Sequence, residues 1–374
     1  ADSSWVDTKR THQRTAWGAS LPCHRVFSFS SWRPASWPRV ALTLLLALGA
    51  AQLCVWLRTP IPWMIGPLVA TALVSVLGAP TESWTPLRNA GQWVIGAALG
   101  LYFTPAVGSL VASLWWAIVI GIVWAVALGL GFGAWLRRVH AGHLATLSPS
   151  ELRSTTYFAG AIGGASEMTL IAERQGARTD LVAAAHSLRV LLVTVTIPFA
   201  LQFAGVSGLD KLAAGVRDVQ PWGLLALGGL TLMGALAMQR LGRANPWFMG
   251  ALVVTMAVTL YGLTFSAIPS ALTNAAQLVI GVSLGVRFTP AFVHTAPRWL
   301  ASVALASVVM MGLCAGFGWL LAGLTHLHPV TLLLGTAPGG IAEMAITAKV
   351  LQLGVPVVTA FQVCRLVAVL VLAE

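Results

Sequence analysis

Charged side chains are scarce in this chain of 374 residues: they make up 9% of the sequence, whereas hydrophobic residues make up 57%. A soluble globular domain usually carries about 25% charged residues. So few charges cannot cover a folded surface against water, which excludes an ordinary soluble domain. The composition predicts an integral membrane protein whose main partner is the lipid bilayer.

Acidic residues and lysine are especially few. The chain has 11 Asp and Glu against 22 Lys and Arg, and only three of those basic residues are Lys. In a soluble protein, the net charge of +11 would suggest a nucleic-acid partner. Here most of the arginines lie in short links between apolar runs, as cytoplasmic anchors do in membrane proteins. We therefore expect no nucleic-acid partner.

Patterns that bind metals or cofactors are also missing. The four Cys form no CxxC pair, and the His residues form no ligand pattern within an apolar segment. No Walker A motif, Rossmann glycine pattern, HExxH sequence or EF-hand loop occurs. We therefore expect no disulfide framework, no metal site and no cofactor. Without a visible nucleophile or metal set, we also expect no enzyme activity.

The chain divides into a polar beginning and a long series of apolar segments. Residues 1–39 are polar and lack the apolar core of a signal peptide, so we interpret them as a cytoplasmic segment. Twelve apolar segments follow, several of them long enough to cross about 30 Å of hydrocarbon as helices. We divide them into a first membrane repeat at 40–204, a linker at 205–220 and a second membrane repeat at 221–374.

An internal repeat supports this division. Asn89–Ala106 reads NAGQWVIGAALGLYFTPA and Asn274–Ala291 reads NAAQLVIGVSLGVRFTPA, with 12 of 18 positions identical and no gap. Two shorter patterns, Pro-Trp-x-x-Gly and Gly-Gly-x-x-Glu-Met, also occur once in each half. Such self-similarity indicates a duplicated structural module.

The basic residues in the links indicate that the second copy is inverted. Arg137 and Arg138 mark the fourth link of the first copy as cytoplasmic, whereas the basic links of the second copy, which contain Arg287 and Arg298, come earlier. This shift requires an odd number of crossings per copy, as in many secondary transporters. We predict an all-α membrane protein with about ten to twelve transmembrane helices, in which one glycine-broken segment per copy does not cross fully.

Four ionisable residues within apolar segments form the candidate binding site. Glu167 and Glu343 belong to the two Gly-Gly-x-x-Glu-Met patterns, and Arg189 and Arg365 each follow 22 residues later. A carboxylate within the membrane is costly and usually acts as a proton carrier, a cation ligand or a counter-ion. A buried arginine stays charged and needs a partner, which either the glutamate or an anionic substrate could supply. In the simpler alternative, each glutamate only pairs with an arginine.

Paired glycines precede each glutamate, at Gly163 with Gly164 and at Gly339 with Gly340. A glycine weakens a helix by about 1 kcal/mol relative to alanine, so a pair predicts a break. Broken backbone at membrane depth exposes amides and carbonyls that can coordinate an ion or an anionic group. The alternative is a close helix crossing at small residues.

The repeated Asn-x-x-Gln string adds Gln92 and Gln277 as polar candidates for the site lining. Each is followed by a GxxxG pair, which lets helices approach closely. We favour a packing motif with a polar lining over a ligand site for these two strings.

The repeated strings resemble the AbrB-type duplicated family of bacterial membrane proteins, which also carries the label ammonia monooxygenase. This family differs from the small soluble DNA-binding regulator of the same name. The resemblance covers about residues 40–374. It implies about ten transmembrane helices, a location in the bacterial inner membrane and a link to the regulation of gene expression. Copper oxidation chemistry would need imidazole-rich sites, and the membrane segments supply essentially one His, His186.

Three functions therefore remain as hypotheses. The first is a secondary transporter of small solutes, anionic ones included, or of protons, and a homo-oligomer is compatible with it. The second is a membrane sensor that affects gene expression through residues 1–39. The third and least expected is a membrane-bound monooxygenase.

Overall fold

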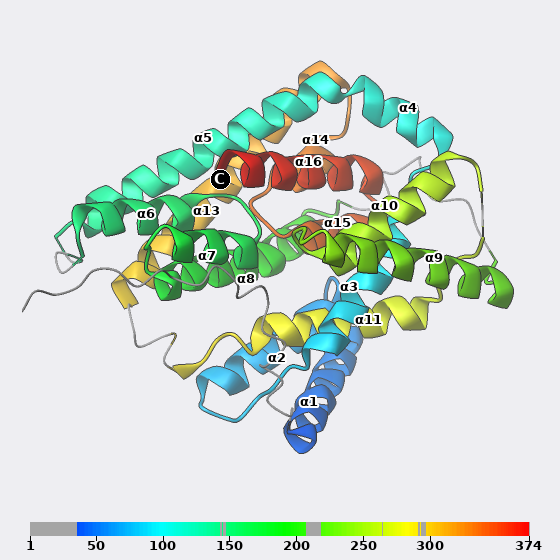
Figure 1. Cartoon of the computed structure of the whole chain (residues 1–374), viewed down its shortest axis with the longest axis horizontal. Coiled ribbons are helices and arrows are strands. Elements are labelled where there is room, and N and C mark those ends of the chain that lie inside the picture. The colour runs from blue at the N-terminus through cyan, green and yellow to red at the C-terminus, as the bar shows by residue number, and fades with distance from the viewer. Residues whose placement is uncertain are drawn as a thin grey trace, which may run out of the picture. The chain divides into compact units, whose positions relative to one another are not determined.

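The computed structural model describes residues 36–142, 144, 147–206, 218–263, 265–290, 292 and 297–373. Most of the predicted cytoplasmic segment and most of the predicted linker lie outside these described residues. Within them the chain forms 15 helices and no strand (Figure 1). This result confirms the predicted all-α class.

The helices are numbered as in Figure 1. The first half of the chain contains α1 (Trp37–Trp56), α2 (Pro62–Val76), α3 (Thr85–Gly100), α4 (Pro105–Ser113), α5 (Trp115–His140), α6 (Pro149–Gly160), α7 (Ala165–Arg174) and α8 (Thr179–Phe203). The second half contains α9 (Pro221–Arg240), α10 (Pro246–Leu260), α11 (Ser270–Gly285), α13 (Pro297–Thr325), α14 (Pro329–Thr336), α15 (Ile341–Leu351) and α16 (Val355–Ala373).

Proline marks the beginning of many of these helices. Pro62 and Pro246 open α2 and α10, and Pro105 opens α4. Proline suits the first turn because its φ is preset and the missing N–H would have no partner within the helix. Before Pro105, the Thr104 hydroxyl accepts a hydrogen bond from the amide of Val107 and caps α4.

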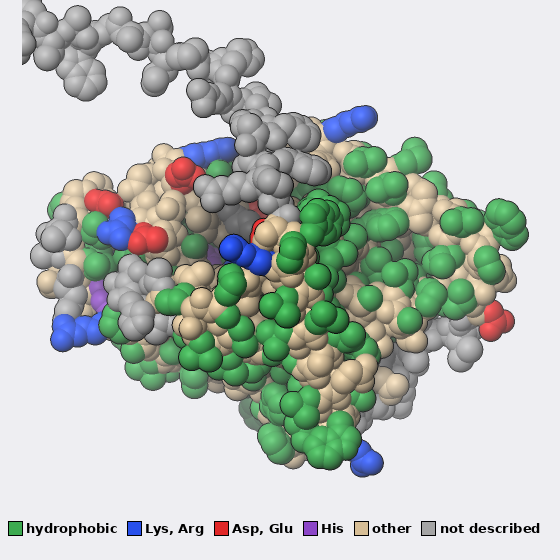
Figure 2. All heavy atoms as spheres, turned by 90° about the horizontal axis from the view of Figure 1, so that it is seen from below, with side chains coloured by type: hydrophobic (Ala, Val, Ile, Leu, Met, Phe, Trp, Pro, Cys, Tyr) green, Lys and Arg blue, Asp and Glu red, His purple; other side chains and the backbone are tan. Residues whose placement is uncertain are grey.

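Six helices are long and apolar enough to cross a membrane: α1, α5, α8, α9, α13 and α16. The pair α3 and α4, bent by 89°, would make a seventh span if counted as one. Only 22% and 17% of the most apolar stretches of α1 and α9 are buried, against 56% and 61% for α8 and α16. The first two therefore expose apolar faces, and hydrophobic side chains cover much of the face in Figure 2. These features fit an integral membrane protein of the helical class.

The described helices pack into two groups, and each group draws on both halves of the chain. Helices α1–α3 pack with α9–α11 and form what we call the short-helix bundle. Helices α5–α8 pack with α13–α16 and form the broken-helix bundle. The two bundles meet where α3 contacts α15 and α16 and where α2 contacts α8. The spatial grouping therefore does not follow the order of the chain.

Close crossings at glycine build the short-helix bundle. The GxxxG pair of α3, Gly96 and Gly100, rests on the backbone of α10, and that of α11 rests on α2. A Cβ added at Gly281 would lie 2.6 Å from the carbonyl oxygen of Met64, closer than real Cβ contacts allow. The prediction that these strings are packing motifs is therefore confirmed.

The crossing at Gly96 leads to a prediction with an internal control. In Gly96→Ala, the added Cβ meets the carbonyl of Phe248, so we expect a loss of about 1–3 kcal/mol in the free energy of unfolding. Gly229 on α9 has open space around it. There the same change should stabilise by up to about 1 kcal/mol through helix propensity. Thermal unfolding in detergent measures the stability of both variants. Equal shifts in their melting temperatures would contradict the close crossing of α3 and α10 at Gly96.

Candidate functional site

Two helices of the broken-helix bundle are interrupted at the predicted places. Helix α6 ends at Gly160 and α7 begins at Ala165, while α14 ends at Thr336 and α15 begins at Ile341. The residues just before α7 and α15, Gly164 and Gly340, have extended backbone. The glycine pairs therefore do break the helices, as the sequence predicts.

The side chains that follow each glycine pair fold back over it. A Cβ added at Gly163 would lie 2.8 Å from Cγ of Met168, and one at Gly339 would lie 3.0 Å from Cγ of Met344. The second glycine of each pair lies directly under the carboxylate of Glu167 or Glu343. The Gly-Gly-x-x-Glu-Met pattern is thus a helix start in which the first turn covers its own bare backbone.

The two glutamates occupy the positive ends of helix dipoles. Glu167 lies in the first turn of α7 and Glu343 in the first turn of α15. The unpaired amides of a first turn and the helix macrodipole both favour a negative group there. Glu343 is 8% exposed, and Glu167 is partly buried. Each carboxylate is therefore held at the amide side of its break.

Arg189 and Arg365 occupy the opposite, carbonyl side of the same breaks. Nη2 of Arg189 donates to the carbonyl oxygen of Ala161 at 2.8 Å, and Nη1 to that of Gly160 at 3.3 Å. Arg365 donates to the carbonyl oxygens of Ala337 at 2.7 Å and Gly339 at 2.9 Å. Both guanidinium groups are buried, so they supply hydrogen bonds to carbonyls that have lost their helical partners.

A second polar side chain assists each arginine. Nε2 of His186 lies 3.0 Å from the carbonyl oxygen of Phe158, and its Nδ1 lies 2.7 Å from Nη2 of Arg189. At the corresponding place in the other half, the Gln362 amide donates to the carbonyl of Leu334 at 2.7 Å. His186 is thus a hydrogen-bonded polar group of the core.

The glutamates and arginines of the predicted site do not form ion pairs with one another. Across the part of the chain that the structure describes, the one salt bridge joins Arg178 and Asp180, which are both exposed. The alternative in which each glutamate only pairs with Arg189 or Arg365 is therefore not what the described residues show. The two charges instead stabilise opposite ends of one break, because one side offers amides and the other carbonyls.

Two arginines that the sequence analysis did not select lie near the glutamates. Arg287, just after α11, interacts electrostatically with Glu167, Glu343 and Arg88. Arg88, in the first turn of α3, interacts with Glu167. Arg287 thus interacts with both carboxylates, and Arg88 with one of them, close to where the short-helix bundle meets the breaks.

The repeat could not reveal this pair, because its counterparts are uncharged. Arg287 aligns with Tyr102 in the first copy, and Arg88 aligns with Thr273 in the second. From the sequence, Arg287 is interpreted as a topological anchor in a link. The signal that could have exposed both is an arginine next to or within the repeated Asn-to-Ala string of one half where the other half has an uncharged residue.

The remaining candidates lie in the short-helix bundle. Gln92 is on α3 and Gln277 is on the neighbouring helix α11, where it is buried. Their role as a polar lining stays a prediction. Among the described residues, no group of three or more His, Cys, Asp or Glu is placed to hold a metal ion.

Sequence comparisons with known proteins find a matching family model and two relatives. A family model described as "Transition state regulatory protein AbrB" matches residues 63–374. An "Uncharacterized protein YhjN" of Bacillus subtilis (strain 168) is 25% identical over 342 residues, which are 83% of this chain and 85% of the relative. A "Putative regulator AbrB" of Escherichia coli (strain K12) is 26% identical over 333 residues, which are 88% of this chain and 91% of the relative.

The arrangement of Arg365 predicts a structural role that can be separated from surface charge. In Arg365→Ala, the buried carbonyl of Gly339 loses its donor, and that of Ala337 keeps only the longer hydrogen bond from the Gln362 amide at 3.2 Å. We expect the free energy of unfolding to fall by about 2–3 kcal/mol. Arg174→Ala, at an exposed position on α7, serves as the control and should change it by less than about 0.5 kcal/mol. Thermal unfolding of the purified variants in detergent measures the difference. Equal stability of Arg365→Ala and Arg174→Ala would show that Arg365 does not stabilise the break.

Proposed function

Because the chain belongs to the AbrB family, whose model matches residues 63–374, we propose that it is a secondary transporter of small anions or protons in the bacterial inner membrane. One observation carries the proposal. Two helix breaks, each with a glutamate at its amide side, face two arginines where the bundles meet.

Broken helices of this kind suit a transport site. Short half-helices direct their amide ends at anionic groups, and unwound carbonyls can coordinate cations. In this chain Arg189 and Arg365 already occupy carbonyls of the breaks. The N-terminal amides of α7 and α15, together with Arg88 and Arg287, remain to attract an anion.

The charge balance of the site provides a way to couple an anion to a proton. Protonation of Glu167 or Glu343 would remove a negative charge that faces Arg287. The freed guanidinium could then bind a carboxylate in the bidentate geometry that arginine favours. One proton together with one monovalent anion leaves the net charge of the site unchanged, which limits the desolvation cost of carrying both.

We propose further that the chain consists of two inverted repeats. The contact of α2 with α11 is matched by that of α10 with α3, and the contact of α5 with α6 by that of α13 with α14. These matching contacts, two between the copies and two within them, support a pseudo-two-fold relation, and the shift in basic links favours its inverted form. Counting the short helices gives about ten crossings.

Such a relation would place the site between parts that can move against each other. Because both bundles take helices from both copies, the exchange of the two copies' conformations would shift one bundle along the other. The glutamates and arginines would then face one side of the membrane and afterwards the other, which is alternating access.

A regulatory role is the second candidate. The name of the Escherichia coli relative, "Putative regulator AbrB", favours it. A regulator needs a surface that contacts a cytoplasmic partner, and residues 1–39 are the polar segment that the sequence offers for it.

The transport hypothesis predicts a loss of coupling when the glutamates are neutralised. In proteoliposomes with an imposed pH gradient, Glu167→Gln and Glu343→Gln should lower the uptake of small carboxylates at least tenfold or abolish its dependence on the gradient. A tenfold effect corresponds to about 1.4 kcal/mol. Glu173→Gln, at an exposed position on α7, is the control. Unchanged rate and unchanged coupling in both site variants would exclude the transporter.

Deletion of residues 1–35 separates transport from regulation. These residues precede α1, so the deletion leaves every described helix in place. A transporter should keep its flux, whereas a regulator acting through this segment should lose its effect on gene expression. Flux in proteoliposomes and transcript levels in cells, measured for the same variant, give the two results side by side.

A further inference from the structure

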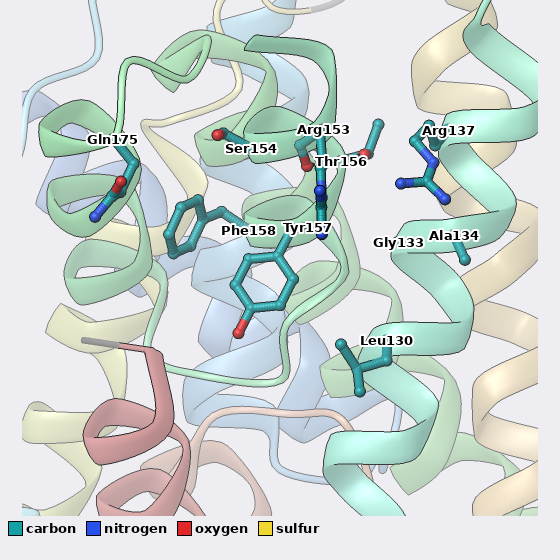
Figure 3. Close-up of a pocket in the computed structure, with 10 residues that line it drawn as sticks. All are labelled: Leu130, Gly133, Ala134, Arg137, Arg153, Ser154, Thr156, Tyr157, Phe158 and Gln175. Atoms are coloured by element: carbon teal, nitrogen blue, oxygen red, sulfur yellow. Dashed lines mark hydrogen bonds between the residues drawn. The ribbon is translucent and has the colours of Figure 1, made fainter. Parts of the chain in front are cut away.

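A groove lies between α5 and α6, away from the helix breaks, and encloses about 540 Å³. It is lined by Leu130, Gly133, Ala134, Arg137, Arg153, Ser154, Thr156, Tyr157, Phe158 and Gln175. Figure 3 shows that Arg137 of α5 and Arg153 of α6 direct their side chains into the gap between the helices, while Leu130 lies farther along α5. The groove therefore has a basic end and an apolar end.

The two arginines have no partner within the described residues. Both are exposed, and neither makes a hydrogen bond or an ion pair there. The carboxylate of Asp180, at the start of α8, accepts hydrogen bonds from Arg178, at 2.9 Å and 2.5 Å. Within the described residues, no ion pair therefore neutralises the positive charge at this end of the groove.

The other end of the groove belongs to a membrane helix. Helix α5 has a mean hydropathy of 2.3 over its most apolar stretch, and its last turn carries Arg137, Arg138 and His140. Leu130 is 50% exposed and Tyr157 is 36% exposed. The groove thus runs from the apolar outer face of the helix to the basic layer at its end, as a phospholipid does from acyl chain to headgroup.

The helix crossing opens the groove next to the arginines. A Cβ added at Gly133 would lie 2.9 Å from the carbonyl oxygen of Thr156, so the two helices touch there. Arg137 lies one turn beyond Gly133 on α5, and Arg153 lies about one turn before Tyr157 on α6. The side chains of both arginines therefore border the place where the helices separate.

The corresponding place in the second half has the crossing but not the charges. Gly318 of α13 approaches Leu333 of α14 as Gly133 approaches Tyr157. Alignment of the two halves places Ala322 and Pro329 at the positions of Arg137 and Arg153. Trp319 stands at the position of Ala134, so a bulky side chain replaces the small one that leaves the groove open. The basic groove is therefore a property of one copy, not a consequence of the shared packing.

We propose that this groove binds the headgroup of an anionic phospholipid, with the phosphate between Arg137 and Arg153 and an acyl chain along Leu130 and Ala134. Guanidinium groups bind phosphate oxygens in a paired geometry, and basic pockets between membrane helices suit anionic headgroups. A lipid matches the groove better than a free phosphate does, because the apolar wall continues onto the exposed face of α5. The inference is independent of the transport proposal.

The test is lipid binding to the purified full chain, delipidated in detergent and measured by native mass spectrometry with phosphatidylglycerol or phosphatidylcholine. The wild type should bind phosphatidylglycerol more tightly than phosphatidylcholine. Arg137→Gln combined with Arg153→Gln should weaken phosphatidylglycerol about 30-fold, as expected for the loss of two basic contacts. Arg138→Gln removes a neighbouring charge that does not line the groove and should leave binding within about twofold.

A second variant tests the apolar wall without changing charge. Ala134→Trp introduces the residue that the second copy carries at the aligned position, Trp319, so α5 should accept it. It should weaken phosphatidylglycerol at least tenfold while the melting temperature stays that of the wild type. Equal phosphatidylglycerol binding by the wild type and the double arginine variant would overturn the proposal. So would inorganic phosphate that displaces the lipid at equal concentration and still binds Ala134→Trp normally.

Discussion

A polar backbone group in apolar surroundings must find a hydrogen-bond partner, and this requirement governs the two helix breaks. A continuous helix satisfies it internally, whereas a break releases carbonyls on one side and amides on the other. Here Arg189 and Arg365 serve the carbonyl sides, and Glu167 and Glu343 stand at the amide sides. The buried charges therefore make the interruption of the helices possible, and the candidate site exists because of it.

Glycine supplies the second condition, which is space. The pairs before α7 and α15 leave room for a carboxylate and a methionine to fold onto the backbone. The glycines of α3 and α11 bring those helices against α10 and α2 within backbone contact. The same helix α3 carries Arg88, which interacts electrostatically with Glu167, and α3 also contacts α15. Packing in one bundle thus sets the electrostatics at the edge of the other.

The sequence predicted the features that depend on local chemistry. The glycine pairs marked the breaks, and the GxxxG strings marked close crossings, because both effects follow from a missing side chain. The partners of Arg189 and Arg365 could not be predicted in this way. A spacing of 22 residues says that two groups recur together, but not whether the arginine meets a carboxylate or a carbonyl. Arg287 was missed because an arginine beside a link looks the same whether it anchors topology or faces a site.

The sequence also could not predict that each bundle contains helices from both halves of the chain. Periodicity and loop charge describe neighbours along the chain, whereas the contacts of α2 with α11 and of α3 with α10 join segments far apart in it. The repeat could have suggested such exchanged partners only if the inward faces of the short helices had been known.

The departure of Arg88 and Arg287 from the repeat has a consequence for the shape of any solute held between the breaks. The glycines, the glutamates, Arg189 and Arg365 recur in both halves of the sequence. Arg88 and Arg287 do not, because they align with Thr273 and Tyr102. The residues that form the breaks thus recur in both halves of the sequence, whereas these two charged side chains do not. A molecule bound there would meet different surroundings at its two ends. Such a site would therefore distinguish the two ends of the molecule and favour an asymmetric solute over one with a two-fold axis of its own.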